Sequence, residues 1–290
     1  MLRCHWFAIF FLLVLPPALA QKTFVEDYRI GEFVSASSID VDPFDHIYVT
    51  DRDASMVYKY DMKGNKLAEI GGPGWGNTEF DQPSGIDASL GVAVYVADYG
   101  NNRIQRFDKE LNFLGSFEGD IPSAVSAQFA YPVDVVVSPL GDLFILDEEN
   151  RRGLYTSGFA NVEFIFGGID AGAGALTSPV AIDIGSENQV FVLEPNRIIE
   201  FDVFGEYQKI FAEGKLSLGQ GIRAIGKSIF VVTPVELYLY TVSGELRSTW
   251  KKENFVFASD PGEFRDIAVH KDRLLLLCER SIIVLPLQKK

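Results

Sequence analysis

Residues Gln82–Gly119 read QPSGIDASLGVAVYVADYGNNRIQRFDKELNFLGSFEG and contain four short apolar segments separated by turn residues. The segment Val92–Ala97 is a continuous apolar run, which predicts a strand covered on both faces. No helical periodicity accompanies it. The stretch therefore predicts one unit of four short strands, which we place at Gly85–Ala88, Val92–Ala97, Arg103–Asp108 and Phe113–Phe117.

The apolar run of this unit recurs along the chain. Six copies are present, and their last residues are Asp51, Asp98, Asp147, Glu194, Thr233 and Cys278. Successive copies end 39 to 49 residues apart. A period of this length, with four strands in each unit, indicates a β-propeller in which neighbouring blades bury each other's faces. The fold class predicted is all-β, a six-bladed propeller of four-stranded antiparallel blades.

The ends of the repeat region predict how the ring closes. The sixth copy has no fourth strand, whereas residues 23–31 resemble the fourth strands of other copies. We therefore expect the N-terminal strand 23–31 to complete the last blade, which removes an exposed sheet edge. The blades are predicted at about 37–72, 82–119, 131–168, 178–214, 218–250 and 262–287.

The second copy resembles an NHL repeat. The resemblance is carried by P-x-G-I at 83–86, YVAD at 95–98 and NNRI-x-x-FD at 101–108, and weaker copies extend it over residues 23–287. It implies a six-bladed propeller and no single function, because RNA-binding, ligand-sensing and lyase propellers share the repeat. Fold alone therefore assigns no activity.

Residues 1–20, MLRCHWFAIFFLLVLPPALA, have the pattern of a secretory signal peptide. Arg3 is followed by nine apolar residues, Phe7–Leu15, too few to span a bilayer that needs about 20. We predict cleavage before Gln21 and a mature domain of residues 21–290 that is secreted or periplasmic, with no membrane insertion after cleavage. An uncleaved anchor or a core strand is the alternative.

The net charge and the cysteine content limit which classes of binding partner are expected. The 290 residues carry 26 Lys+Arg against 40 Asp+Glu, a formal charge of −14. This acidity argues against nucleic acid, whose binding needs cationic side chains at phosphates. Only Cys278 follows the signal, so the mature chain has no internal disulfide, and its apolar neighbours predict a buried thiol. The expected partner is a protein or a small extracellular ligand, bound by a monomer.

The innermost strands carry one charged side chain each on the face toward the central channel. Aligning the copies gives Asp40, Asp87, Asp134, Asp183, Arg223 and Asp266. Asp134 and Asp266 lie two residues earlier than the others, which keeps the same strand face. One hypothesis is that these carboxylates hold Ca²⁺, Mg²⁺ or a cationic ligand at a channel mouth. The other, which we favour, is that each accepts backbone N–H groups of a neighbouring blade, with Arg223 paired to Asp183 or Asp266.

Three acid–arginine pairs follow the second strands, namely Asp98–Arg103, Asp147–Arg152 and Glu194–Arg197. They could form a row of ligand-binding charges. Because the pairing follows the repeat, we favour ion pairs that brace the turn inside each blade.

Other residues give little support for catalysis. Amidating-lyase propellers, which the resemblance includes, bind zinc through several histidines, but after the signal this chain has only His46 and His270, in separate turns. Trp75 lies in the glycine-rich loop 71–77, where it either packs over the adjacent blade, as we favour, or makes a surface contact.

We therefore expect an exported, non-enzymatic binding or interaction propeller with an unidentified ligand. No catalytic residue and no firm cofactor are predicted. The alternative is a metal-dependent lyase or hydrolase, of the calcium type, with its site at the mouth of the central channel.

Overall fold

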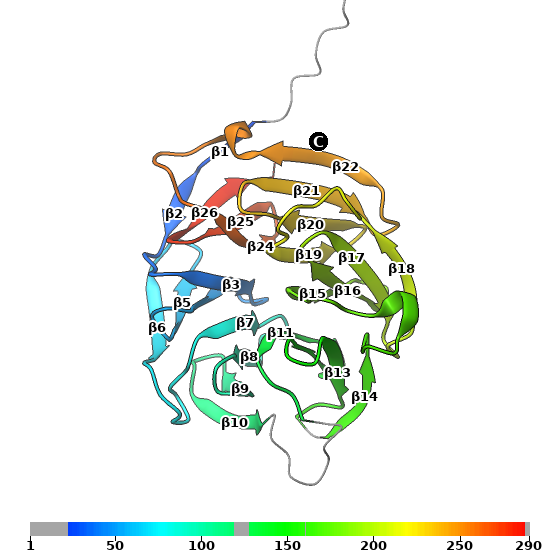
Figure 1. The fold of residues 1–290 in the computed structure, drawn as a ribbon. Helices are drawn as coiled ribbons and strands as arrows, with labels where there is room; N and C mark the ends of the chain where they lie inside the picture. Colours follow the sequence, from blue (N-terminus) through cyan, green and yellow to red (C-terminus); the bar gives the residue numbers. More distant parts are fainter. Residues whose placement is uncertain (1–22, 119–127, 160, 288–290) are drawn as a thin grey trace, which may run out of the picture.

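The computed structural model describes residues 23–118, 128–159 and 161–287, which form six four-stranded antiparallel sheets arranged in a ring (Figure 1). The predicted all-β, six-bladed propeller is confirmed. Helical structure in the described residues is confined to two short 3₁₀ turns, Gly172–Gly174 and Lys252–Asn254, and none of it could cross a membrane. The predicted signal peptide lies outside the described residues.

Each blade begins at the ring axis and adds strands outward (Figure 1). The strands are, in blade 1, β3 (Ala36–Val41), β4 (His46–Asp51), β5 (Met56–Asp61) and β6 (Lys66–Gly71); in blade 2, β7 (Pro83–Asp87), β8 (Ala93–Asp98), β9 (Arg103–Asp108) and β10 (Phe113–Glu118); in blade 3, β11 (Pro132–Val137), β12 (Leu143–Asp147), β13 (Arg152–Thr156) and β14 (Val162–Phe166); in blade 4, β15 (Ala181–Ile184), β16 (Gln189–Glu194), β17 (Arg197–Asp202) and β18 (Tyr207–Phe211); in blade 5, β19 (Gly221–Ile225), β20 (Ser228–Val232), β21 (Glu236–Thr241) and β22 (Leu246–Lys251); and in blade 6, β24 (Phe264–His270), β25 (Arg273–Cys278), β26 (Ser281–Pro286) and β2 (Tyr28–Ile30).

The hydrophobic core lies between the blades. Every residue of β8 is buried, as expected for a continuous apolar run covered on both faces, whereas every residue of the outer strand β6 is exposed or half-buried. One cluster joins Tyr48 of blade 1 to Val94 and Phe107 of blade 2. Cys278 is fully buried, and burial raises the pKa of its thiol to about 12, so it remains an unreactive thiol.

The N-terminal segment closes the ring as predicted. Strand β2 pairs antiparallel with β26, with Tyr28 opposite Val284 and Ile30 opposite Ile282. The segment is not one continuous strand, however. The short strand β1 (Phe24–Val25) instead pairs in parallel with β23 (Phe255–Val256), and the Phe24 ring stacks on Phe255.

The repeated acid–arginine pairs brace the loops between blades. Arg103 Nε lies 2.8 Å from Asp98 Oδ2, and its Nη atoms donate to the carbonyls of Trp75, Gly76 and Glu79. The favoured ion pairs do form, but the arginines brace the loop that precedes each blade, whereas the prediction placed this bracing at the turn inside the blade. The Trp75 side chain itself is 72% exposed, so it does not pack over the blade, and its role as a surface contact stays a prediction.

Closure by β2 predicts the effect of shortening Ile30, which is 1% exposed. Ile30→Ala should lower the free energy of unfolding by about 2–5 kcal/mol, because it removes packing between blades 6 and 1. Denaturant unfolding measures this. Val25→Ala, at a side chain that is 54% exposed, is the matched control and should change stability by less than about 0.5 kcal/mol. Equal small effects would contradict closure by this strand.

Candidate functional site

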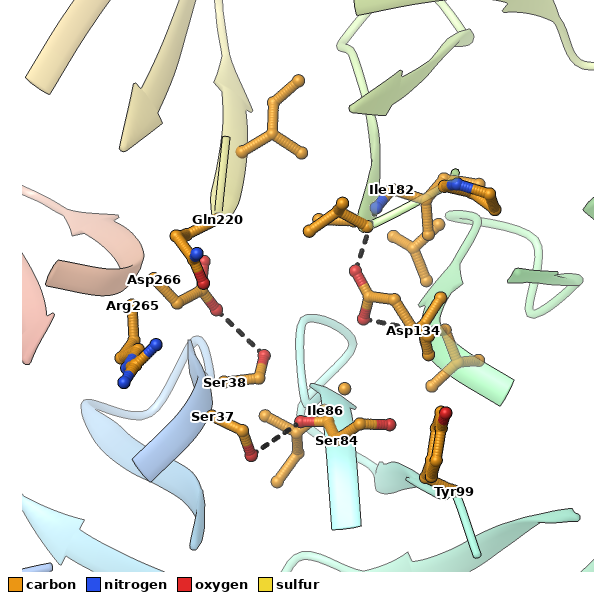
Figure 2. A pocket seen from close by; sticks show the side chains of 18 of the residues that line it. Ser37, Ser38, Ser84, Ile86, Tyr99, Asp134, Ile182, Gln220, Arg265 and Asp266 are labelled. Carbon is orange, nitrogen blue, oxygen red and sulfur yellow. Dashed lines mark hydrogen bonds between the residues drawn. The ribbon is translucent and has the colours of Figure 1, made fainter. Parts of the chain in front are cut away.

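A cavity of about 370 Å³ lies on the ring axis, at the face where the inner strands begin (Figure 2). We call it the funnel. The inner strands of all six blades line it, together with Arg52, Tyr99 and Glu148 from the loops that follow the second strands of blades 1, 2 and 3.

The six charged residues predicted for the channel face do lie on the inner strands, and they connect each blade to the next. Five carboxylates accept a backbone N–H from the following blade. The contacts are Asp40 with Ala88 N (2.8 Å), Asp87 with Val137 N (3.0 Å), Asp134 with Ile182 N (2.9 Å), Asp183 with Ala224 N (2.6 Å) and Asp266 with Ile39 N (3.0 Å). Arg223 serves the remaining junction by donating to the Ile267 carbonyl at 3.4 Å. We call this set the carboxylate ring.

Arg223 also compensates charge within the carboxylate ring. Its Nη2 lies 3.1 Å from Asp40 Oδ1, and its Nε lies 3.9 Å from Asp183 Oδ2. The pairing with Asp183 was predicted, and the shorter contact with Asp40 was not. Asp40 comes from blade 1, so its approach to blade 5 depends on ring geometry that the repeat alignment does not contain.

Burial raises the pKa values of four of these carboxyl groups. The pKa of Asp87 is raised to about 7, first by burial and then by the charge of Asp40. The pKa of Asp266 is raised to about 6 by burial, against the lowering effect of Arg223. Burial also raises the pKa values of Asp134 and Asp183. The carboxylate ring is therefore a place where protonation and folding are coupled.

The described residues do not fit a metal site. Both oxygens of Asp134 accept backbone N–H groups, and Asp266 binds two N–H groups and the Ser38 hydroxyl. No group of three or more His, Cys, Asp or Glu side chains in the part of the chain described could hold a metal ion. His46 is the first residue of β4 and His270 is the last residue of β24, so both lie at the face of the ring opposite the funnel. There they pair with Asp42 and Asp45. The described residues therefore do not assemble the zinc set that the resemblance to amidating lyases implies.

A hydrogen-bonded tyrosine–carboxylate pair with a neighbouring arginine lies at the rim of the funnel. The Tyr99 hydroxyl donates to Glu148 Oε2 at 2.7 Å, and the Arg52 guanidinium carbon lies 4.5 Å from the centre of the Tyr99 ring. Tyr131 packs against the same ring at 5.1 Å. Burial, followed by the bond to Glu148, raises the pKa of Tyr99, while Arg52 lowers it. The group therefore combines an acid, a carboxylate and a cation beside an open cavity.

The sequence analysis did not identify Arg52, Tyr99 and Glu148, which we call the trio, although their positions in the repeat give a signal. Arg52, Tyr99 and Glu148 each follow directly after the polar residue that ends a second strand. The equivalent position in blades 4 and 5 holds Pro195 and Pro234. An alignment of copies draws attention to residues that recur, whereas these three differ from one another.

Blades 1, 2 and 3 share a further set of contacts beneath the trio. The Ser37 hydroxyl donates to the Pro83 carbonyl at 2.9 Å, and the Ser84 hydroxyl donates to the Pro132 carbonyl at 2.9 Å. Ser84 also accepts at its carbonyl from the Thr50 hydroxyl at 2.7 Å. These bonds fix the relative positions of the three blades that carry the trio, as a preorganised site requires.

Comparison with known proteins places the chain among propellers. A probable peptidyl-α-hydroxyglycine α-amidating lyase of Caenorhabditis elegans is 24% identical over 138 residues, which is 46% of this chain and 39% of that protein. Virginiamycin B lyase from Staphylococcus aureus superposes with a TM-score of 0.66 at 14% identity, over 89% of this chain and 98% of the other. A streptogramin B lyase gives 0.63 at 15% identity, over 91% and 87%. No family model matches the chain.

These findings correct one expectation. The relatives are named as lyases, so the expectation of a non-enzymatic binding propeller is wrong, and the alternative of an enzyme fits better. The structural likenesses are too distant to show more than the six-bladed fold. The chain also covers well under half of the nematode relative's length.

The raised carboxyl pKa values predict how stability depends on pH. Between the unfolded value of about 4 and the folded values of about 7 for Asp87 and about 6 for Asp266, the folded chain binds more protons than the unfolded chain. The free energy of unfolding should therefore fall as the pH rises through this window, giving a lower Tm at about pH 8 than at about pH 5.5.

Two variants test this assignment: Asp87→Asn cannot titrate at the ring, and Asp170→Asn is the control. Asp87→Asn keeps an oxygen acceptor for Val137 N–H and should reduce the difference in Tm between the two pH values. Asp170→Asn, at an exposed loop position, should leave the difference unchanged. A Tm that rises over the same pH window would refute the assignment.

Proposed function

We propose that this chain is a lyase-type enzyme whose reaction takes place in the funnel. The observation that carries the proposal is the Tyr99–Glu148 hydrogen bond of 2.7 Å at the rim of a 370 Å³ cavity. The names of the relatives support the reaction class. A cavity with convergent polar groups is where a small-molecule reaction is expected in such a fold.

The trio can complete an elimination without a further reactant. The Glu148 carboxylate takes a proton from the substrate, and the Tyr99 hydroxyl gives its proton to the leaving atom as the bond to carbon breaks. The proton on Glu148 then passes to Tyr99 along their hydrogen bond, which restores both groups. Arg52 stabilises the negative charge that develops on Tyr99 during the transfer.

The walls of the funnel orient the substrate. The trio and the hydroxyls of Ser37 and Ser84 contribute polar groups, and inner strands of blades 3, 4 and 5 contribute aliphatic side chains beside polar ones such as Gln220. We expect the reacting polar group of the substrate to lie toward Tyr99, which Figure 2 labels, and its apolar part to lie against the aliphatic side chains. The aliphatic side chains include Val133, Val180, Ile182 and Ile222.

Substitution of the trio tests the proposal. Tyr99→Phe and Glu148→Gln should each lower kcat about 10²–10⁴-fold, because each removes one proton-transfer group. Turnover is measured on the substrates that the relatives' names supply, a peptidyl-α-hydroxyglycine and virginiamycin B, with products followed by mass spectrometry. Tyr207→Phe, at a partly exposed tyrosine of β18, is the matched control and should retain activity. Full activity in both trio variants would show that neither side chain transfers a proton in the reaction.

We also propose that the repeats are of the NHL type and that the protein is a monomer exported to the periplasm or the extracellular space. The N-terminal pattern of residues 1–20 supports export. Expression of the full chain in a secreting host should give a mature product that begins at Gln21, as intact-mass measurement will show. Removal of residues 2–20 should retain the product inside the cell. A product that keeps Met1 would refute cleavage.

A further inference from the structure

We infer that Gln82 is a positioning residue, which holds the Arg52 guanidinium against the Tyr99 ring and thereby controls proton transfer at Tyr99. The inference deepens the proposed function, and its catalytic consequence rests on that function. The positioning itself is a property of the folded chain that can be measured without a substrate.

The contact between Gln82 and Arg52 fixes the guanidinium plane. Gln82 Oε1 accepts from both Nε and Nη2 of Arg52, at 3.2 and 3.0 Å. These two donors lie on one edge of the guanidinium, so a single carbonyl oxygen restrains its rotation. Without that acceptor a long arginine side chain samples many rotamers, and holding it in one costs conformational entropy.

The backbone of Gln82 supports the same conclusion. Its φ is 55°, in the left-handed region that non-glycine residues rarely occupy. The residue before it is also held in place, because Asp81 N donates to Asp98 Oδ1 and Asp81 O accepts from Gly100 N, both at 2.8 Å. Asp81 is thus bonded to the two residues that flank Tyr99 in the chain, and Gln82 follows directly after it.

Tyr131 occupies the equivalent position in the next blade. Each of the two residues directly precedes a proline that starts an inner strand, and Tyr131 has a φ of 54°. The Tyr131 ring contacts Tyr99, while Gln82 acts on Tyr99 through Arg52. Two residues with positive φ, at equivalent positions of neighbouring blades, therefore act on the Tyr99 side chain. Backbone strain of this kind persists where the surrounding structure enforces it, and it clusters at functional sites.

The electrostatic consequence follows from the position of Arg52. Its charge favours the ionised form of Tyr99 and lowers the pKa of that group, against burial and the Glu148 carboxylate, which raise it. Loss of the Gln82 acceptor releases Arg52 from the ring and leaves the raising effects unopposed. The Tyr99 proton then transfers less readily.

The test is a spectroscopic titration of Tyr99. Phenolate absorbance is recorded against pH for each variant and subtracted from that of the same variant carrying Tyr99→Phe. Gln82→Leu should move the Tyr99 midpoint upward by about half a pH unit, the size of one lost cation–π contact.

A glycine variant separates the side chain from the backbone. Gln82→Gly removes the strain at φ 55° and should raise Tm, yet it should move the Tyr99 midpoint as Gln82→Leu does. Gln208→Leu, at an exposed glutamine of β18 that bonds only Asp202 and Glu206, should leave the midpoint unchanged.

The outcomes distinguish this inference from the proposed function. A midpoint that does not move in Gln82→Leu overturns the positioning role, even where Tyr99→Phe abolishes turnover. A midpoint that moves as expected supports the role, even where Tyr99→Phe leaves turnover intact and the lyase assignment fails. If both hold, Gln82→Leu should lower kcat with little change in KM.

Discussion

The structure depends on one interaction repeated around the axis, the hydrogen bond from a backbone N–H of one inner strand to a carboxylate of the blade before it. An inner strand has no neighbouring strand on its axial side, so its backbone groups there would lose their partners on burial. A charged acceptor supplies strong hydrogen bonds at these points. Five aspartates serve five junctions in this way, and Arg223 serves the sixth through a carbonyl.

These hydrogen bonds between blades also determine the electrostatics at the ring axis. The carboxylates that join the blades are forced into a small buried volume, so their charged forms are disfavoured and several pKa values rise. Arg223 offsets part of the repulsion by approaching Asp40 and Asp183. Because the carboxylate oxygens accept hydrogen bonds from backbone N–H groups, the carboxylates act as junctions between blades. The chemistry that we propose for this face therefore lies at the rim, where Tyr99 and Glu148 line the cavity.

The sequence was sufficient for the features that a comparison of the copies reveals. These are the apolar runs, which recur in all six copies, the inner aspartates, which recur in five, and the absence of a fourth strand from the sixth copy. The contacts of the site are not local. Tyr99 and Glu148 lie 49 residues apart, in the loops that follow the second strands of two neighbouring blades. An alignment of repeats does not encode contacts between blades, and for that reason the sequence pointed to a non-enzymatic module.

Positions that hold the same residue in several copies of the repeat, and positions that differ between copies, have different roles in such a ring. A residue that recurs with the repeat, such as the arginine found in blades 2, 3 and 4, has the same structural role in each copy, and in this chain it braces a loop. A residue that differs between equivalent positions is free of that shared duty. Arg52, Tyr99 and Glu148 occupy one such position in three adjacent blades, and the ring places them in contact as a cation, an acid and a carboxylate. In a sixfold scaffold, a site is therefore to be sought where residues that depart from the repeat meet, as these three do at the rim of the funnel.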